Sequence, residues 1–290
     1  MAKNGTLMID GTDICSVYGA FVSEGGLASL VQWPSLKTPE SNDWFEEEGL
    51  EVDLSSPVLS SRDVSMEFIL ANDHGLSGFL DFLAAKTFHS VYSPDLGMTF
   101  RLRWVSCAKV DTINDEIGKV SLTFADDFPL WGYTRSLAAV TVADSGIALD
   151  GTDIASYGVI ALQGTGDSFR MVASAKTPLR RNVDSLCGSI TDGVKDGDLT
   201  TEAGSAYDNP ALKRGSRTLS IKCLMAKMTV AQFASNWRCL LYDLSQSGAR
   251  MVAGFGKTLN CYYSSCQVTR FYSATGGLWC EFTVNLVVVG

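Results

Sequence analysis

The pentapeptide Asp10-Gly11-Thr12-Asp13-Ile14 occurs a second time in this chain, as Asp150-Gly151-Thr152-Asp153-Ile154, and Tyr-Gly follows each copy closely. A short apolar run precedes each copy. Asp-Gly pairs next to such runs are typical of the tight turns of β-hairpins, since Gly adopts positive φ without steric cost. The two pentapeptides therefore predict that a unit opening with a β-turn occurs twice along the chain.

Further matches keep the same order through both halves of the chain. The matched segments are Lys37-Thr38-Pro39 with Lys176-Thr177-Pro178, Ser61-Arg62 with Ser216-Arg217, Ser106-Cys107 with Ser265-Cys266, and Leu122-Thr123-Phe124 with Phe282-Thr283-Val284. A chain of 290 residues also has room for two compact cores. We expect one domain over 1–135, a linker over 136–145, and a second copy over 146–290 with a Gly- and Asp-rich insertion near 191–209.

Each predicted unit contains one amphipathic helix after a long strand. Apolar residues recur at helical spacing, and they place Phe79 and Leu83 on the core face of the first helix and Phe233 and Trp237 on that of the second. Asn72-Asp73 could cap the first helix. The pattern Thr229-x-x-Gln232 is typical of a capping box at the start of the second.

The remaining pattern predicts antiparallel strands. Apolar and polar residues alternate over 64–70 and 219–225, which is the period of half-buried strands. Further strands are expected over 98–104, 107–113 and 119–125, and over 258–263, 266–272 and 278–289. The predicted fold class is mainly β with one helix per unit (α+β), arranged as two tandem β-sandwich or barrel domains. The pattern does not fix the path of the loop at 34–57.

Composition favours a folded, soluble chain, since 46% of the residues are hydrophobic and 19% are charged. We expect no export signal and no membrane span, because the N-terminus lacks an apolar signal region and no apolar stretch approaches the required length. The eight cysteines are scattered without a CxxC pair, so we interpret them as reduced thiols, mostly buried. No cofactor or metal site is predicted.

Charge differs between the two halves of the chain. Residues 1–140 carry 9 Lys and Arg against 20 Asp and Glu, a net charge of −11, whereas residues 141–290 carry 14 against 12, a net charge of +2. An acidic surface repels phosphate, which disfavours adhesive or sequence-specific DNA binding. Any contact with DNA is expected to be non-specific passage.

The sequence favours a non-enzymatic protein. Its two histidines, His74 and His89, belong to no metal-ligand or catalytic motif, and we expect capping or surface roles for both. Gly164-Thr165-Gly166 lacks the third Gly of a dinucleotide-binding loop and is interpreted as a turn.

The first copy contains Asn42-Asp43-Trp44-Phe45-Glu46-Glu47-Glu48-Gly49-Leu50-Glu51-Val52-Asp53, and then Ser61-Arg62-Asp63-Val64-Ser65 before its strand and helix. With the opening Ile-Asp-Gly-x-Asp-Ile and Tyr-Gly, these segments resemble the N-terminal ring domain of distal tail proteins of long-tailed bacteriophages. The resemblance implies a tail-tube-like fold, a β-sandwich with a flanking helix that assembles into six-fold rings. The second copy departs from it, because residues 180–188 lack the Trp and the acidic run.

The resemblance implies a structural component of a phage tail, a distal tail or tube ring around the DNA channel that docks other tail proteins. Its implied location is the virion tail, assembled in the bacterial host cytoplasm. Three chains could form a pseudo-hexamer, which we favour, or six could form a hexamer. The residues assigned to a channel or inter-subunit loop are Trp44, Glu46, Glu47, Glu48 and Glu51.

Two alternatives stay open for these features. The acidic run could be an ordinary solvated loop. The chain could also be a receptor- or carbohydrate-binding module at the tail tip, because exposed aromatic rings can stack on sugars. The aromatic residues considered for that role are Trp33, Trp44, Tyr207, Tyr262 and Tyr263.

Overall fold

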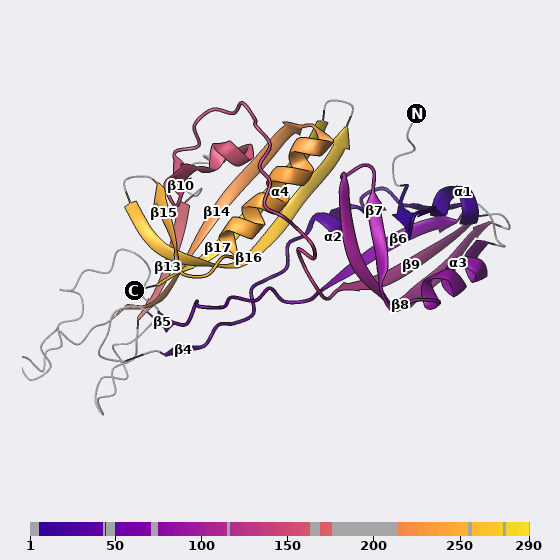
Figure 1. Ribbon diagram of the computed structural model, residues 1–290, viewed down its shortest axis with the longest axis horizontal. Coiled ribbons are helices and arrows are strands. Elements are labelled where there is room, and N and C mark those ends of the chain that lie inside the picture. Colours follow the sequence, from indigo (N-terminus) through magenta and orange to yellow (C-terminus); the bar gives the residue numbers. More distant parts are fainter. Residues whose placement is uncertain are drawn as a thin grey trace, which may run out of the picture.

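The computed structural model describes residues 6–42, 44, 50–70, 75–114, 117–162, 169–175, 214–254, 257–274 and 277–289. The protein is mainly β, as the sequence predicts. Figure 1 shows an elongated molecule with two β-rich units placed end to end. The first unit, on the right, contains the elements from β1 to β9 apart from β4 and β5, which lie at the lower left beside the second unit. The second unit, on the left, contains the elements from β10 to β17.

The first unit is built around a seven-stranded antiparallel sheet with the order β2-β1-β7-β8-β9-β6-β3. Its strands are β1 (Met8–Ile9), β2 (Thr12–Asp13), β3 (Ala20–Val22), β6 (Arg62–Leu70), β7 (His89–Ser93), β8 (Met98–Asn114) and β9 (Ile117–Asp126). A separate hairpin of β4 (Ser41–Asn42) and β5 (Glu51–Val52) lies outside this sheet.

The second sheet repeats the strand order of the first, as β11-β10-β15-β16-β17-β14-β12, with β13 added beside β14. Its strands are β10 (Ile147–Leu149), β11 (Thr152–Asp153), β12 (Val159–Ala161), β13 (Phe169–Ala175), β14 (Arg214–Met228), β15 (Arg250–Gly254), β16 (Lys257–Ala274) and β17 (Gly277–Val288). Each strand of the first sheet thus has a counterpart at the same place in the second.

The repeated pentapeptide forms the same hairpin turn in both units. Asp10 and Gly11 have φ values of 51° and 81°, and Asp150 and Gly151 have 48° and 80°. Two successive residues with positive φ define the turn that matches the twist of a two-residue hairpin. The predicted opening turns are therefore confirmed.

The second Asp of each pentapeptide caps the short helical turn that follows it. Asp13 accepts hydrogen bonds at the start of α1 (Ile14–Tyr18), and Asp153 does so at the start of η1 (Ile154–Tyr157). A side-chain oxygen at this position satisfies backbone N–H groups that have no partner within the helix. The repeated Thr-Asp-Ile sequence thus encodes a cap as well as a strand.

The two long central strands are continuous at the positions where the sequence pattern predicted a break. β8 is continuous over Met98–Asn114, and β16 over Lys257–Ala274, where two strands each were expected. A bulge lies between Trp104 and Ser106, and a second lies at the matching place, between Tyr263 and Ser265. The extra residue interrupts the alternation without ending the strand, which explains the error.

The bulged strands change partners along their length. The first part of β8 pairs with β7 and the rest with β9, and β16 divides in the same way between β15 and β17. Each unit is consequently one continuous, hydrogen-bonded run of strands that curls around its core.

The register of the last strand corrects one of the sequence matches. Leu122 pairs with Met66, whereas the residue paired with the matching Ile221 is Val284 and not Phe282. The true correspondence is shifted by two residues from the sequence match. Because side chains alternate with a period of two, this shift keeps the same residues on the core face.

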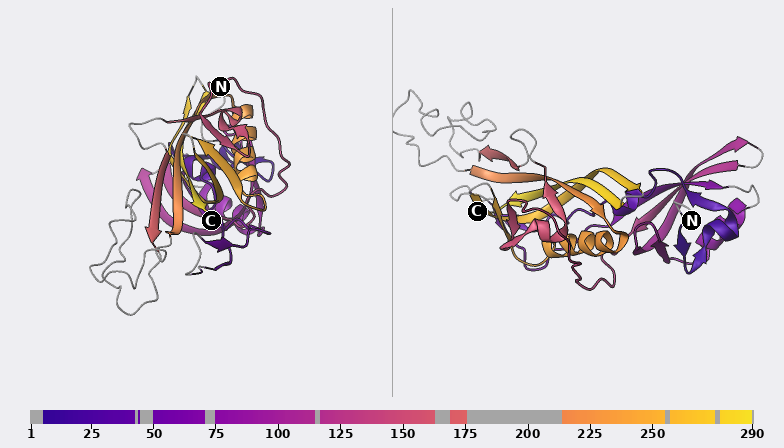
Figure 2. Two further views of the ribbon diagram at one scale, coloured as in Figure 1. Left: turned by 90° about the vertical axis from the view of Figure 1, so that its left-hand side faces the viewer. Right: turned by 90° about the horizontal axis from the view of Figure 1, so that it is seen from above.

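One longer helix covers a face of each sheet, α3 (Gly75–Ala84) in the first unit and α4 (Val230–Leu244) in the second. The right-hand view of Figure 2 shows α4 lying along one face of the second sheet. The predicted core-face residues are all buried, namely Phe79, Leu83, Phe233 and Trp237. The capping box of Thr229 and Gln232 is confirmed.

The first unit has more helix than the single one that was expected. Besides α3 it contains α1 and a short helix α2 (Ala28–Val31), which leads toward the second unit. The candidate cap Asn72-Asp73 lies outside the described residues, as does the whole of the predicted insertion near 191–209.

The predicted linker, together with Arg135 just before it, is bonded to α4 of the second unit. Arg135 makes two hydrogen bonds to the carboxylate of Asp243, of 2.7 and 2.8 Å. Asn236 accepts from the backbone N–H of Ala138 at 2.7 Å and donates to its carbonyl at 3.0 Å. These bonds hold the connection between the units against the helix.

Candidate functional site

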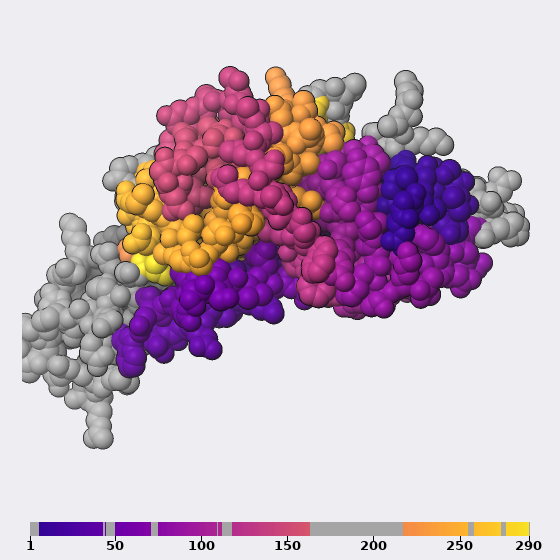
Figure 3. Space-filling model, viewed as in Figure 1, coloured from indigo at the N-terminus to yellow at the C-terminus, as the bar shows by residue number. Residues whose placement is uncertain are grey.

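The path of the loop at 34–57 is the main feature that joins the two units. We call residues 32–61 the arm. The arm leaves the first unit after α2 and runs along the second unit to the β4–β5 hairpin (Figure 1). Figure 3 shows its violet surface lying against the second unit. The arm folds back on itself, with Lys37 N–H donating to Val58 O at 2.8 Å and Ser60 N–H to Ser35 O at 2.8 Å.

Trp33, at the base of the arm, inserts into the core of the second unit. Its side chain is 5% exposed. Its ring lies 4.4 Å from Trp237 on α4, 6.0 Å from Tyr263 on β16 and 5.9 Å from Phe282 on β17, measured between ring centroids. Buried aromatic clusters of this kind dominate the energetics of interfaces. Trp33 therefore ties the first unit to the second.

Two polar atoms of this aromatic cluster donate hydrogen bonds to backbone carbonyls, one at the end of α2 and one in the arm. Trp237 Nε1 donates to Val31 O at 3.0 Å. Tyr263 Oη donates to Pro34 O at 2.7 Å. A buried indole N–H or phenol O–H without a partner would cost free energy. Because the accepting carbonyls lie on either side of Trp33 in the chain, these bonds favour one position of Trp33 in the cluster.

The arm also bonds to the open edge of β16. Gln32 accepts from Val268 N–H at 3.0 Å with its Oε1, and its Nε2 donates to Cys266 O. Leu36 N–H donates to Ser264 O at 2.9 Å, at the bulge. The arm thus occupies backbone groups that would otherwise be exposed on the strand edge, a common way for proteins to protect such edges.

A buried ion pair lies beside this junction. Arg62 Nε is 3.2 Å from Asp126 Oδ2, and its other nitrogens donate to Ser29 O at 2.7 Å and Leu30 O at 3.0 Å. Burial raises the pKa of Asp126, and the Arg62 guanidinium opposes that rise. The guanidinium holds the last carbonyls of α2, which directs the chain into the arm.

The tip of the arm carries the residues that were assigned to a channel or inter-subunit loop. Trp44 is 51% exposed, and its Nε1 donates to Glu51 Oε2 at 2.7 Å. The tip is attached to the second unit by a bond of 2.8 Å from Gly248 N–H to Leu54 O. Glu46, Glu47 and Glu48 lie outside the described residues. The structure thus brings Trp44 and Glu51 together on the exposed face of the arm.

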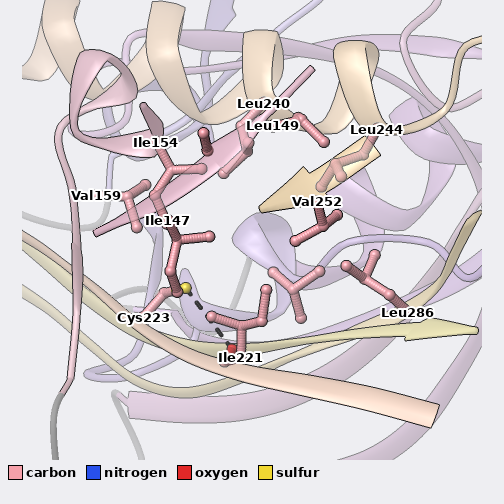
Figure 4. A pocket seen from close by; sticks show the side chains of 12 residues that line it. Ile147, Leu149, Ile154, Val159, Ile221, Cys223, Leu240, Leu244, Val252 and Leu286 are labelled. Atoms are coloured by element: carbon pink, nitrogen blue, oxygen red, sulfur yellow. Dashed lines mark hydrogen bonds between the residues drawn. The ribbon is translucent and has the colours of Figure 1, made fainter. Parts of the chain in front are cut away.

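The apolar pocket in the second unit is a small packing void. Its volume is about 30 Å³, and Ile147, Leu149 and Leu286 are among the residues that line it. Figure 4 shows these side chains, with Cys223 donating from its sulfur to Ile221 O. A space this small and without polar groups in its lining is no substrate site.

His89 differs from its expected surface role. It is fully buried, with Nδ1 3.0 Å from Asp10 Oδ2 and Nε2 2.9 Å from Leu83 O. Burial raises the pKa of Asp10, but bonds from Ser90 N–H, Lys86 and His89 outweigh it and the net pKa is lowered. His89 thus fixes the opening turn to the end of α3. His74 lies outside the described residues.

The pattern did not reveal an exposed aromatic cluster in the first unit. The guanidinium of Arg101 lies 4.2 Å from the ring centre of Phe88, 5.1 Å from that of Phe128 and 4.2 Å from that of Trp131. Trp131 is 63% exposed and Phe128 is 45% exposed. Because these residues lie on separate segments, only the fold brings them together.

The aromatic residues considered for sugar binding differ in their exposure. Trp33 and Tyr263 are buried and cannot stack on a sugar, which corrects that part of the expectation. Trp44 is exposed and Tyr262 half-buried, and Tyr207 lies outside the described residues.

In the part of the chain that the structure describes, no group of three or more His, Cys, Asp or Glu side chains is placed to hold a metal ion. The described cysteines are free thiols. Within the same residues, none of the helices has the length and apolar character that crossing a membrane requires. Neither the models of known protein families nor the curated proteins give a match to this sequence.

Proposed function

We propose that this protein is a structural subunit of a phage tail, a distal tail or tube component that forms a ring around the DNA channel and docks other tail proteins. The resemblance of its first unit to ring domains of tail proteins suggests this role. The proposal assigns it no catalytic residue, and it places the protein in the virion tail.

The observation that carries the proposal is the way in which the two units join. Both sheets have one strand order, and the arm of the first unit covers the strand edge of the second. A unit that binds its own duplicate through an arm and a strand edge is suited to building a repeating assembly. The described part of the chain contains such a junction.

Charge supports a channel through which DNA passes without being held. The half of the chain that contains the first unit carries −11, and the other half carries +2. Acidic walls lower the affinity for phosphate and let a duplex slide. DNA is therefore proposed as a non-specific passenger.

Electron microscopy of the purified protein tests the proposal. We expect rings with a central hole wide enough for duplex DNA. Particles that stay compact and hole-free at high protein concentration would refute a ring-forming role.

The exposed aromatic cluster around Arg101 favours a second candidate, a receptor- or carbohydrate-binding module at the tail tip. A flat indole with a neighbouring cation can stack on a sugar ring and bind its hydroxyl groups. A glycan array tests this candidate. Binding that disappears in Trp131→Ala and persists in Trp44→Ala would support it, and an array without signal would refute it.

A further inference from the structure

We propose that the exposed aromatic cluster around Arg101 binds a sugar that carries a carboxylate group. In this site the guanidinium of Arg101 takes the carboxylate, and the exposed ring of Trp131 stacks on the sugar ring. The inference rests on the second candidate function, a receptor- or carbohydrate-binding module, and deepens it by naming the class of sugar and the residue that selects it. We call Phe88, Arg101, Phe128 and Trp131 the Arg101 cluster.

Arg101 lies on the outer face of the first sheet. Its neighbour Leu102 on β8 is fully buried in the core, and side chains alternate between the two faces along a strand. Arg101 pairs with Ser90 on β7, which is exposed. Phe88, the residue before β7, has its ring centre 4.2 Å from the guanidinium carbon of Arg101. Phe88 therefore supplies one wall of the cluster.

The segment after β9 supplies the other two rings, and hydrogen bonds fix its path. Trp131 N–H donates to Phe128 O at 3.0 Å, and Tyr133 N–H donates to Leu130 O at 3.0 Å. The side chain of Leu130, which lies between the two exposed rings in sequence, packs against the hydrophobic core. The rings of Phe128 and Trp131 are thus held in place before a ligand arrives, so that binding costs little conformational entropy.

Arg101 differs from Arg103, the next arginine on the same face of β8. Arg103 is bonded to the carboxylate of Asp127 at 2.7 and 3.1 Å, so its charge has a partner. Among the described residues, no group forms a hydrogen bond or an ion pair with the guanidinium of Arg101. Ring faces attract a cation, but they do not satisfy the N–H groups along its edge. Arg101 is therefore a fixed cation with donors that no described group uses.

The ligand class follows from these two features, the cation and the exposed ring. A carboxylate matches the planar fork of a guanidinium and accepts two of its N–H groups at once. A sugar ring offers a flat face that stacks on an indole, and Trp131 is 63% exposed. A neutral sugar would use the ring alone, and a carboxylate without a ring would use the cation alone. A sugar that carries a carboxylate uses both.

Charge limits the ligand to one that carries few negative groups. Residues 1–140, which include the whole Arg101 cluster, have a net charge of −11 and repel a polyanion. We therefore expect a mostly neutral glycan that ends in a single acidic sugar, such as a sialic acid or a hexuronic acid.

A comparison of ligands on the wild-type chain tests this site without altering the fold. The probes are oligosaccharides that end in sialic or glucuronic acid, each matched with the same oligosaccharide after reduction of its carboxyl group to an alcohol. We expect wild type to bind the acidic member of each pair about tenfold tighter or more, as biolayer interferometry measures it, since hydrogen bonds between charged groups are the stronger kind. High salt should reduce this preference.

Substitution of Arg101 assigns the preference to that residue. Arg101→Gln should bind both members of a pair equally, and Arg101→Lys should keep only part of the preference, because lysine retains the charge and lacks the planar fork. Arg270→Gln is the matched control, since this arginine of the second unit has a side chain that is 63% exposed and should leave both affinities unchanged. Thermal melting of the variants checks that they fold.

Each contrary result removes a different part of the proposal. Equal affinity of wild type for both members of every pair would overturn the role of the carboxylate and leave the carbohydrate-binding candidate standing. An acidic preference that persists in Arg101→Gln would place the site elsewhere. Displacement of the glycan by a tetraglutamate peptide at equal concentration would make the cluster a site for acidic peptides. If wild type binds no oligosaccharide, acidic or neutral, the carbohydrate-binding candidate fails as well.

Discussion

Replacing Trp33 with alanine should uncouple the two units. The ring is 5% exposed and contacts three aromatic rings of the second unit. Truncation of a buried large aromatic residue costs about 3–5 kcal/mol, through lost burial and the cavity that is left. Most of that free energy holds the units together. We therefore expect Trp33→Ala to lower the free energy of unfolding by about 3–5 kcal/mol and to separate the unfolding of the two units into distinct transitions.

Urea denaturation followed by circular dichroism measures this change. Trp44→Ala is the matched control, because that side chain is 51% exposed and should cost less than about 1 kcal/mol. A Trp33→Ala variant that unfolds at the wild-type urea concentration, in one transition, would refute the coupling role of Trp33.

Three further predictions concern the core of the first unit, the acidic run and a half-buried carboxylate. Phe79→Ala should lower the free energy of unfolding by about 3–5 kcal/mol in urea denaturation, and wild-type stability would place the core face of α3 elsewhere. Changing residues 46–48 together from Glu to Gln should move the melting temperature little, since exposed charges contribute within about 0.5 kcal/mol each, and a collapse would make the loop structural. Burial raises the pKa of Asp243, but bonds from Arg135 and Tyr157 lower it on balance. A carboxylate whose pKa is lowered in the folded protein stabilises it above the ordinary pKa of 3.8, and this stabilisation is lost as the pH falls toward the folded pKa. Asp243→Asn should therefore reduce the loss of stability in acid, as urea denaturation at several pH values measures it. A variant with the same pH dependence as wild type would refute this role of Asp243.

Local signals in the sequence were sufficient for much of the fold. The Asp-Gly turns, the capping box at Thr229 and the core faces at Phe79 and Trp237 depend on neighbours within a few residues, and the structure contains each of them. Their geometry is fixed by φ preferences, helix caps and side-chain periodicity. A pattern read along the chain can detect such features.

The features that sequence reasoning missed depend on residues far apart in the chain. Trp33 was considered an exposed aromatic, but its partners on α4, β16 and β17 lie more than two hundred residues away. His89 follows a helix and looked like a surface residue, yet Asp10 and Leu83 enclose it. Bulges at Val105 and Ser264 hid the continuity of the long strands. Nothing in the local pattern encodes these contacts.

Native mass spectrometry of the purified protein tests most directly whether the duplicated units assemble into the proposed ring, because it measures the mass of the assembly. We predict a closed species of about 94 kDa, three times the chain mass of 31.2 kDa, in which each chain supplies two units. A species of about 187 kDa, six times that mass, would keep the ring and assign one unit of each chain to a separate tier. A single species of 31.2 kDa at the highest attainable concentration would contradict self-assembly.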